Sequence, residues 1–548
     1  NCSTSSTDPT NPFPSNFFCN PSGIDGLTIT NSSQGGGGIF VHAWGHYIQI
    51  ANNRVRNNSG TLSGGINIGQ GEYPPSYTAG GGATNGAPGS CQSENGLPTG
   101  TQLQYCLDTH VNLHHNSITL NSSTGDELFS ATPAGAGGVS ICNGSDYYKF
   151  NYNWVCGNMS TGDGGGMAHI GFSANGDIEH NTVLFNQSTN PTIATNGGGI
   201  LIMGAPDVDP TCGITTDQDC VSVPPVGPAD GAGPGLVINA NLIMGNAAES
   251  GSGGGLRLQH LNGTDVLTFP TTPNNWYGVN VTNNIIANNV AGWDGAGISL
   301  LDALKVNIIN NTIVSNDSTA SSGVLFNTLG APLASSAGPT CTSNCGTNSL
   351  PQPSGLVSVQ NSVNLTHNLP ATVNCPAGHG DAINGACRNY SVPELYNNVI
   401  WQNRTFNIGV GSLGAGALNQ QNVVALYNAF TNTQAPTQPT SDATTANGGG
   451  AIITGGTGAC TAASYWDIGV RGDTGPANHS SGLTLTPTYS VLTDAGDYPG
   501  LNNSGSNPTL LSQYCNGSRV PPEIVASGGG LGWQVPPGIS DATVPNPI

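Results

Sequence analysis

Residues 111–121 read Val111-Asn112-Leu113-His114-His115-Asn116-Ser117-Ile118-Thr119-Leu120-Asn121, and the phrase in this stretch recurs along the chain. Counted from the second aliphatic residue, Leu113, an Asn stands at +3, an aliphatic residue at +5 and another Asn at +8. Further copies begin at Ile48, Tyr148, Asp177, Leu236, Val279, Val306 and Leu395. A phrase repeated with fixed internal offsets indicates one structural unit per copy, as in the coils of a solenoid.

Most copies are preceded by two or three glycines and a short alternating apolar run, for example Gly138-Val139-Ser140-Ile141. Period-two runs broken by Gly or Asn are typical of strands. Gly138 to Gly166 is 28 residues, a spacing that suits one turn of a parallel β-helix. Stacked coils align like residues in columns. We therefore expect an all-β parallel β-helix with an aliphatic core and Asn ladders at its bends.

The composition supports an all-β chain. Among 548 residues there are 81 Gly and only 7% charged residues, and no long apolar stretch of helical period competes with the strand pattern. No run of about 18 apolar residues is present, so we expect no membrane span. The chain begins with Asn1-Cys2 and shows no signal-peptide pattern, which we interpret as a mature or excised form.

Cysteine usage indicates an oxidising compartment, hence a secreted or cell-surface protein. The 14 Cys are even in number and bracket loops, as in a disulfide framework. No C-x-x-C pair occurs, which disfavours zinc-thiolate sites. The expected pairs are Cys2 with Cys19, Cys91 with Cys106, Cys142 with Cys156, Cys212 with Cys220, Cys341 with Cys345, Cys375 with Cys387, and Cys460 with Cys515.

The net charge of −21, from 30 acidic residues against nine Lys and Arg, limits the partners. Affinity for DNA or RNA depends mainly on neutralising phosphates, so nucleic acid is excluded. Polyanionic glycans such as polygalacturonate would also be repelled. Neutral glycans, other extracellular chains or a second copy of this chain remain as partners.

We expect three regions. Residues 1–30 form an N-terminal cap, residues 31–403 form the β-helix, and residues 404–548 form an irregular C-terminal cap or a further β module. Long insertions at 70–107, 204–234 and 327–354 each follow a Gly-led strand, the last of them Gly323-Val324-Leu325-Phe326. Insertions at one coil position project from one face, which we expect to be the functional surface. Within the least regular part, Gly355-Leu356-Val357-Ser358-Val359 resembles one more coil strand.

Two groups could bind metal ions. Asp207, Asp209, Asp217 and Asp219 flank Cys212 and end beside Cys220, so their carboxylates could hold Ca²⁺, although the spacing is not that of an EF-hand; a solvated acidic loop is the alternative. His115, Tyr152 and His180 fall in one column on successive coils and could meet a transition metal, or be ordinary residues of a turn. No cofactor is otherwise indicated.

Catalytic candidates are few. His260 lies close to Arg257, which we expect to point outward, and Asp302 lies one coil on, near Asp265. Two carboxylates and an imidazole in one groove are what glycoside cleavage requires. The alternative is a solvated face that carries a few polar residues.

The Gly-triplet strands followed by the Asn phrase, through about residues 35–403, resemble the right-handed parallel β-helix repeat proteins of the pectate-lyase-like superfamily. The phrases Gly36-Gly37-Gly38-Ile39-Phe40-Val41-His42-Ala43-Trp44 and Tyr465-Trp466-Asp467-Ile468-Gly469-Val470-Arg471-Gly472-Asp473 look like those of large secreted bacterial proteins, some associated with multicopper modules. The resemblance implies right-handed winding but no single function, because the family includes lyases, hydrolases, adhesins and scaffolds. No H-x-H copper pair is present, so copper chemistry is not carried over.

Three functional hypotheses follow. The first is an extracellular structural or interaction scaffold that presents a loop-decorated face and assembles with itself or other chains. The second is a carbohydrate-active enzyme, a glycoside hydrolase or lyase on a neutral polysaccharide. The third is a metal- or redox-associated secreted protein. The scarcity of catalytic groups favours the first.

Overall fold

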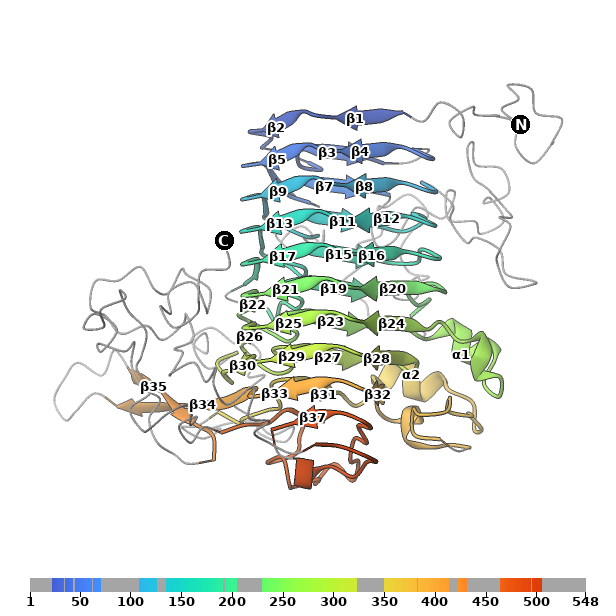
Figure 1. Cartoon of the computed structure of the whole chain (residues 1–548), viewed down its shortest axis with the longest axis vertical. Coiled ribbons are helices and arrows are strands. Elements are labelled where there is room, and N and C mark those ends of the chain that lie inside the picture. The colour runs from blue at the N-terminus through green and yellow to red at the C-terminus, as the bar shows by residue number, and fades with distance from the viewer. Residues whose placement is uncertain are drawn as a thin grey trace.

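The chain is a parallel β-helix in which four long sheets of short strands run side by side along one axis (Figure 1). The computed structural model describes residues 22–33, 35–42, 45–61, 63–69, 108–125, 135–190, 193–204, 229–322, 349–381, 383–412, 422–430, 464–493 and 495–504. Each coil visits the four sheets, here named A to D, in the order C, A, B and D. For example, β11 in sheet C is followed by β12, β13 and β14 and then by β15, again in sheet C.

Sheets A and B form two adjoining faces, and every neighbouring pair of strands within them is parallel. Sheet A contains β1 (Gly23–Asp25), β4 (Gln49–Ala51), β8 (Asn112–His114), β12 (Lys149–Asn151), β16 (Asp177–Glu179), β20 (Leu236–Asn239), β24 (Val279–Thr282), β28 (Val306–Ile309) and β32 (Glu394–Tyr396). Sheet B contains β2 (Thr28–Thr30), β5 (Arg54–Arg56), β9 (Ser117–Thr119), β13 (Trp154–Cys156), β17 (Thr182–Leu184), β21 (Leu242–Met244), β25 (Ile285–Ala287), β29 (Thr312–Val314), β33 (Val399–Trp401) and β37 (Val491–Leu492).

Sheets C and D complete the coils. Sheet C contains β3 (Ile39–Val41), β7 (Ile66–Ile68), β11 (Val139–Ile141), β15 (Met167–Ile170), β19 (Ile200–Met203), β23 (Leu256–Gln259), β27 (Ile298–Leu301), β31 (Leu356–Ser358) and β36 (Ile468–Val470). Sheet D contains β6 (Ser59–Gly60), β10 (Ser122–Ser123), β14 (Met159–Ser160), β18 (Gln187–Ser188), β22 (Ala247–Ala248), β26 (Val290–Ala291), β30 (Asp317–Ser318), β34 (Arg404–Ser412) and β35 (Asn422–Asn428). Only the last pair in this sheet, β34 and β35, is antiparallel.

The core is a continuous column of aliphatic side chains. In sheets A and B the central residue of most strands points inward, as Leu113 does in β8 and Ile118 in β9, and both are fully buried. Like residues of successive coils are register partners, for example Phe150 and Ile178, so they stack directly. The apolar area removed from water contributes roughly 25 cal/mol per Å². Because the alternation has a period of two, a slip of one residue would turn this whole column outward.

Two columns of buried asparagines lie at the bends. One column occupies the turn from sheet A to sheet B, and the other occupies the turn from sheet B to sheet D. Asn116 is typical: its Nδ2 donates to Oδ1 of Asn153 at 3.0 Å and to the carbonyl of Ile50 at 2.8 Å, and its backbone N–H also donates to Asn153 Oδ1. The residue before each Asn of the first column is left-handed, with φ of 54° at His115. The amides therefore satisfy backbone groups that a sharp bend would leave unpaired.

The coils extend beyond the expected boundaries at both ends. Strands β1 and β2 already pair with β4 and β5, so residues 23–30 belong to the helix and not to a separate cap. At the other end β36 continues sheet C and β37 continues sheet B. Parts of the region expected to be a separate C-terminal cap or module are therefore built into the same helix.

The insertions leave the helix at two positions, which corrects the expectation of a single loop face. Residues 70–107 and 204–234 connect sheet C to sheet A. The strand that pairs with β27 is β31, within Gly355–Val359, and Gly323–Phe326 lies outside the described residues. Residues 327–354 therefore fall between sheets D and C. The connection from sheet C to sheet A in that coil is instead residues 359–393.

Two local cysteine pairs fall within the described residues. Cys375 and Cys387 form a disulfide, as expected. The expected disulfide between Cys142 and Cys156 is wrong, because Cys142 follows β11 in sheet C whereas Cys156 lies on β13 in sheet B, on another face of the coil. The Sγ of Cys142 instead lies 3.6 Å from Oδ1 of Asn67.

The other five expected disulfides stay predictions. All of their cysteines lie outside the residues that the structure describes, so the structure neither joins nor separates them. These pairs are Cys2 with Cys19, Cys91 with Cys106, Cys212 with Cys220, Cys341 with Cys345, and Cys460 with Cys515. The framework of seven disulfides expected from the sequence is therefore reduced to one that is present and five that are untested.

The helices of the described residues are short and lie outside the strands of the coils. They are α1 (Thr264–Thr268) and α2 (Val363–Asn368), with 3-10 turns at Pro273–Asn275, Ala386–Arg388 and Ala495–Asp497. Figure 1 shows α1 and α2 beside the sheet A edge of the helix, next to β24 and β28. Within the described part of the chain, none of these helices has the length and apolarity to cross a membrane.

Candidate functional site

His260 and Asp302 interrupt a column that two preceding coils fill with glycine. The last residues of β15, β19, β23 and β27 are register partners, so the residues that follow them, Gly171, Gly204, His260 and Asp302, form one column. The backbone is left-handed at Gly171, with φ of 87°, not at Gly204, and again at His260 (53°) and Asp302 (50°). This conformation costs an L side chain about 1 kcal/mol or more relative to glycine.

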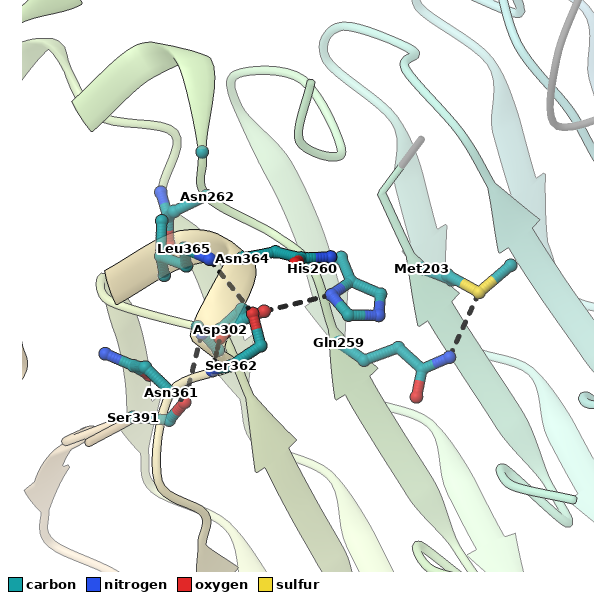
Figure 2. A network of polar contacts seen from close by, with 12 residues as sticks. Met203, Gln259, His260, Asn262, Asp302, Asn361, Ser362, Asn364, Leu365 and Ser391 are labelled. Atoms are coloured by element: carbon teal, nitrogen blue, oxygen red, sulfur yellow. Dashed lines mark hydrogen bonds and ion pairs between the residues drawn. The ribbon is translucent and has the colours of Figure 1, made fainter. Parts of the chain in front are cut away.

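The two side chains contact each other directly (Figure 2). Nδ1 of His260 lies 3.1 Å from Oδ2 of Asp302, and the other carboxylate oxygen, Oδ1, accepts from the backbone N–H of Ser362 at 2.6 Å. The Asp302 side chain is 3% exposed, whereas that of His260 is 30% exposed. A buried carboxylate thus holds Nδ1 of an imidazole that is itself partly exposed.

The electrostatics define the tautomer of this His–Asp dyad. Burial by itself raises the pKa of Asp302, but the hydrogen bond and charge of His260, with hydrogen bonds from Ser362, outweigh burial and lower the pKa overall. The carboxylate is therefore ionised and accepts a proton donated by Nδ1. In a neutral imidazole with its proton on Nδ1, Nε2 carries a lone pair and can act as a general base. An oriented imidazole of this kind recurs in hydrolytic enzymes.

The connection from β31 to β32 supports the dyad from behind. Ser362 caps α2, because its Oγ accepts from the backbone N–H of Leu365 at 3.1 Å. Ser391 donates to Oδ1 of Asn361 and accepts from the backbone N–H of Ala303, which directly follows Asp302. Figure 2 shows these residues on one side of the imidazole and Gln259 and Met203 on the other. The disulfide between Cys375 and Cys387 closes the same connection.

The two remaining catalytic candidates, Asp265 and Arg257, have other hydrogen-bond partners, although the charge of Asp302 acts on Arg257. Asp265 is buried and accepts from the backbone N–H groups of Gly263 and Tyr277 at 2.7 Å each, so it builds the loop around α1. Arg257 alternates with the core residues Leu256 and Leu258 and so lies on the outer side of sheet C, where neighbouring residues cover it and leave it only 3% exposed. Its Nε donates to Gln259 Oε1 at 2.9 Å, and burial lowers its pKa to about 10.

A second site, which the sequence did not indicate, is a cleft of about 440 Å³ over the outer face of sheet A. Its lining includes Tyr147, Lys149, Asp177, Glu179 and Gly235. The carboxylates stand two residues apart on β16 and therefore share one face of the strand. A pair of acidic residues on one strand was a visible signal, but it lay inside the repeat phrase and was assigned to the fold.

The residues expected to bind a transition metal form an aromatic stack. The ring centroids of His115 and Tyr152 are 5.2 Å apart, and those of Tyr152 and His180 are 4.9 Å apart, with interplanar angles of 21° and 18°. No cluster of three or more His, Cys, Asp or Glu side chains suited to a metal ion occurs in the described ranges. Metal binding at this stack stays a prediction. The expected calcium ligands Asp207, Asp209, Asp217 and Asp219 lie outside the described residues.

Comparison with protein-family models, curated proteins and solved structures finds no match to this chain.

Proposed function

We propose that the chain is a carbohydrate-active enzyme, a glycoside hydrolase or lyase acting on a polysaccharide without acidic groups, with His260 as its general base. The observation that carries this proposal is the contact between His260 and Asp302, both left-handed, in a column that the two preceding coils fill with glycine. His260 and Asp302 stand on adjacent coils in place of the glycines of the two preceding coils, and their side chains contact each other. We also propose that the β-helix is right-handed, that the chain is similar to the pectate-lyase-like superfamily, and that the protein is extracellular.

The dyad supplies one defined chemical step. Nε2 of His260 removes a proton from a substrate hydroxyl, an activated C–H or a water molecule and becomes the Nε2–H of an imidazolium. The ionised Asp302 stabilises that positive charge through the Nδ1–H bond. General base catalysis of this type contributes typically about 10²- to 10⁴-fold to the rate. The substrate class is supported by the net charge of −21, which disfavours polyanions.

The test is product formation from a panel of polysaccharides without acidic groups, both neutral and positively charged, measured as new chain ends. We expect His260→Gln and Asp302→Asn to lower kcat by about 10²-fold or more while KM changes little, because the base acts in the transition state. His367→Gln is the matched control, since His367 is an exposed imidazole on nearby α2. Full activity of His260→Gln, or no product from any polysaccharide with the wild-type chain, would overturn the proposal.

A second candidate is a structural or interaction scaffold. The observation in its favour is that the four sheets continue from β1 to β37 with nine or ten strands each, so the described coils form a stiff rod. Sedimentation of the purified chain tests this candidate. Concentration-dependent assembly together with an inactive wild-type protein would favour the scaffold over the enzyme.

A further inference from the structure

The cleft over sheet A begins where an aromatic stack ends. The residues that enter the sheet A strands form a left-handed column, in which Tyr47, His110 and Tyr147 are followed by Asn175 and Gly235. Ring centroids are 4.6 Å apart between Tyr47 and His110 and 4.9 Å apart between His110 and Tyr147, with the latter pair nearly parallel at 7°. Because no ring follows Tyr147 in this column, the stack stops beside the carboxylates of β16, and Asn175 and Gly235 continue the lining of the cleft.

The volume and lining suit one sugar residue of a longer chain. A cleft of about 440 Å³ lies within the size range of small-molecule sites. Tyr147 offers an apolar aromatic surface on one side, and Asp177 and Glu179 offer hydrogen-bond acceptors on the floor. Asn239 on β20 donates from Nδ2 to Glu179 Oε1 at 3.1 Å and holds that carboxylate in place.

The charges in the cleft leave a negative excess. Asp177 faces Lys149 across the β12–β16 pairing, whereas Glu179 faces Asn151 and Asn239. Burial raises the pKa of Asp177, and the neighbouring charge of Glu179 raises it further, although Lys149 opposes them.

The surrounding imidazoles do not remove this excess. Burial, followed by the charges of His46 and Lys149, lowers the pKa of His110, so the imidazole in the lining is neutral near pH 7. Burial and the neighbouring His115 similarly lower the pKa of His114 on β8. The remaining imidazole close to Asp177 is that of His180, at the bend that follows β16. His180 does not line the cleft, so among the lining residues two carboxylates face one ammonium.

We propose that this cleft binds an amino sugar, a pyranose that packs on Tyr147 and places a primary ammonium between Asp177 and Glu179. A cation there relieves the repulsion of the two carboxylates, which a neutral sugar leaves in place. The net charge of −21 also attracts cationic chains from a distance. The inference rests on the proposed function in that it names the kind of residue the polysaccharide carries. Binding, however, requires no catalysis.

The test is titration calorimetry with tetramers of β-linked glucosamine, glucose and galacturonate. It uses His260→Gln, which lacks the proposed base and therefore does not consume the ligand. We expect the glucosamine tetramer to bind at least tenfold more tightly than the glucose tetramer and the galacturonate tetramer not to bind. Adding Asp177→Asn or Glu179→Gln should weaken glucosamine binding at least tenfold, and high salt should weaken it as well.

The matched control is Glu394→Gln, since Glu394 occupies the column of Asp177 on the outer face of sheet A but lies on β32, outside the cleft. This variant should bind the glucosamine tetramer as before. Equal affinity for the glucose and glucosamine tetramers, or undiminished binding after loss of both carboxylates, would overturn the amino-sugar proposal. Glucosamine binding by a wild-type chain that cleaves nothing would instead overturn only the proposed enzymatic function.

Discussion

Acidification should weaken the β-helix through one buried histidine. His169 on β15 is fully buried; its Nδ1 lies 2.9 Å from Oη of Tyr148, and its Nε2 lies 3.0 Å from the carbonyl oxygens of Gly171 and Ala232. Two carbonyls require a proton on Nε2, so Nδ1 accepts from the tyrosine and the imidazole is neutral. Burial lowers the pKa of His169 to about 4, against the smaller opposing effect of those carbonyl hydrogen bonds.

The magnitude follows from the difference between folded and unfolded pKa values. An unfolded pKa of about 6.5 and a folded pKa of about 4 correspond to about 3 kcal/mol between pH 7.5 and pH 4. Acidification lowers the free energy of unfolding. Below pH 6.5 His169 binds a proton in the unfolded chain, whereas in the folded chain it stays neutral until the pH approaches 4. Burial acts oppositely on two carboxyl groups: it raises the pKa of Asp108 to about 7 and that of Asp467 to about 6, which favours the folded state as pH falls.

Because these contributions oppose each other, the assay compares variants and not pH values alone. Urea unfolding of wild type and His169→Gln at pH 7.5 and pH 4 gives two differences in the free energy of unfolding. We expect the wild-type advantage to shrink by about 3 kcal/mol at pH 4. The exposed-site variant His367→Gln should show no such change. If the difference in free energy of unfolding between wild type and His169→Gln were the same at both pH values, the assignment of a neutral His169 with a lowered pKa would be refuted.

Three further predictions concern the coil bends, the dyad and the disulfide. Asn153→Leu should lower the free energy of unfolding by about 2–4 kcal/mol, because it leaves buried N–H and carbonyl groups of neighbouring coils unpaired. The control Asn307→Ala, on the outer face of sheet A, should change it by less than about 0.5 kcal/mol. Urea unfolding measures both variants. His260→Gly should leave the thermal midpoint nearly unchanged while abolishing activity, because relief of left-handed strain offsets one lost hydrogen bond; a large loss of stability would mark the dyad as structural. Cys375→Ser with Cys387→Ser should cost about 3 kcal/mol by loop-closure entropy, and an unaltered midpoint in differential scanning calorimetry would contradict this.

The candidate site shows where pattern reasoning stops. His260 and Asp302 were both candidates, but their contact depends on the register between β23 and β27 and on the backbone N–H of Ser362, 60 residues further along the chain. Asp265 was grouped with them because it is near in sequence, yet the loop around α1 turns it toward Tyr277. Asp177 and Glu179 were concealed by the repeat, because an outward position on a regular strand carries no local sign of a cleft above it.

The sequence by itself determined the repeating unit of this protein. The offsets that join Leu113, Asn116, Ile118 and Asn121 are local, and any chain that stacks such units buries the same aliphatic residues and pairs the same amides. Only the tertiary structure decided which irregular residues meet. Connections of unequal length separate the coils, so Cys142 and Cys156 are near in sequence but lie on different faces, while His260 and Asp302 are joined across a coil. Contacts between coils depend on register and on the path of the insertions, and neither is encoded in a local period.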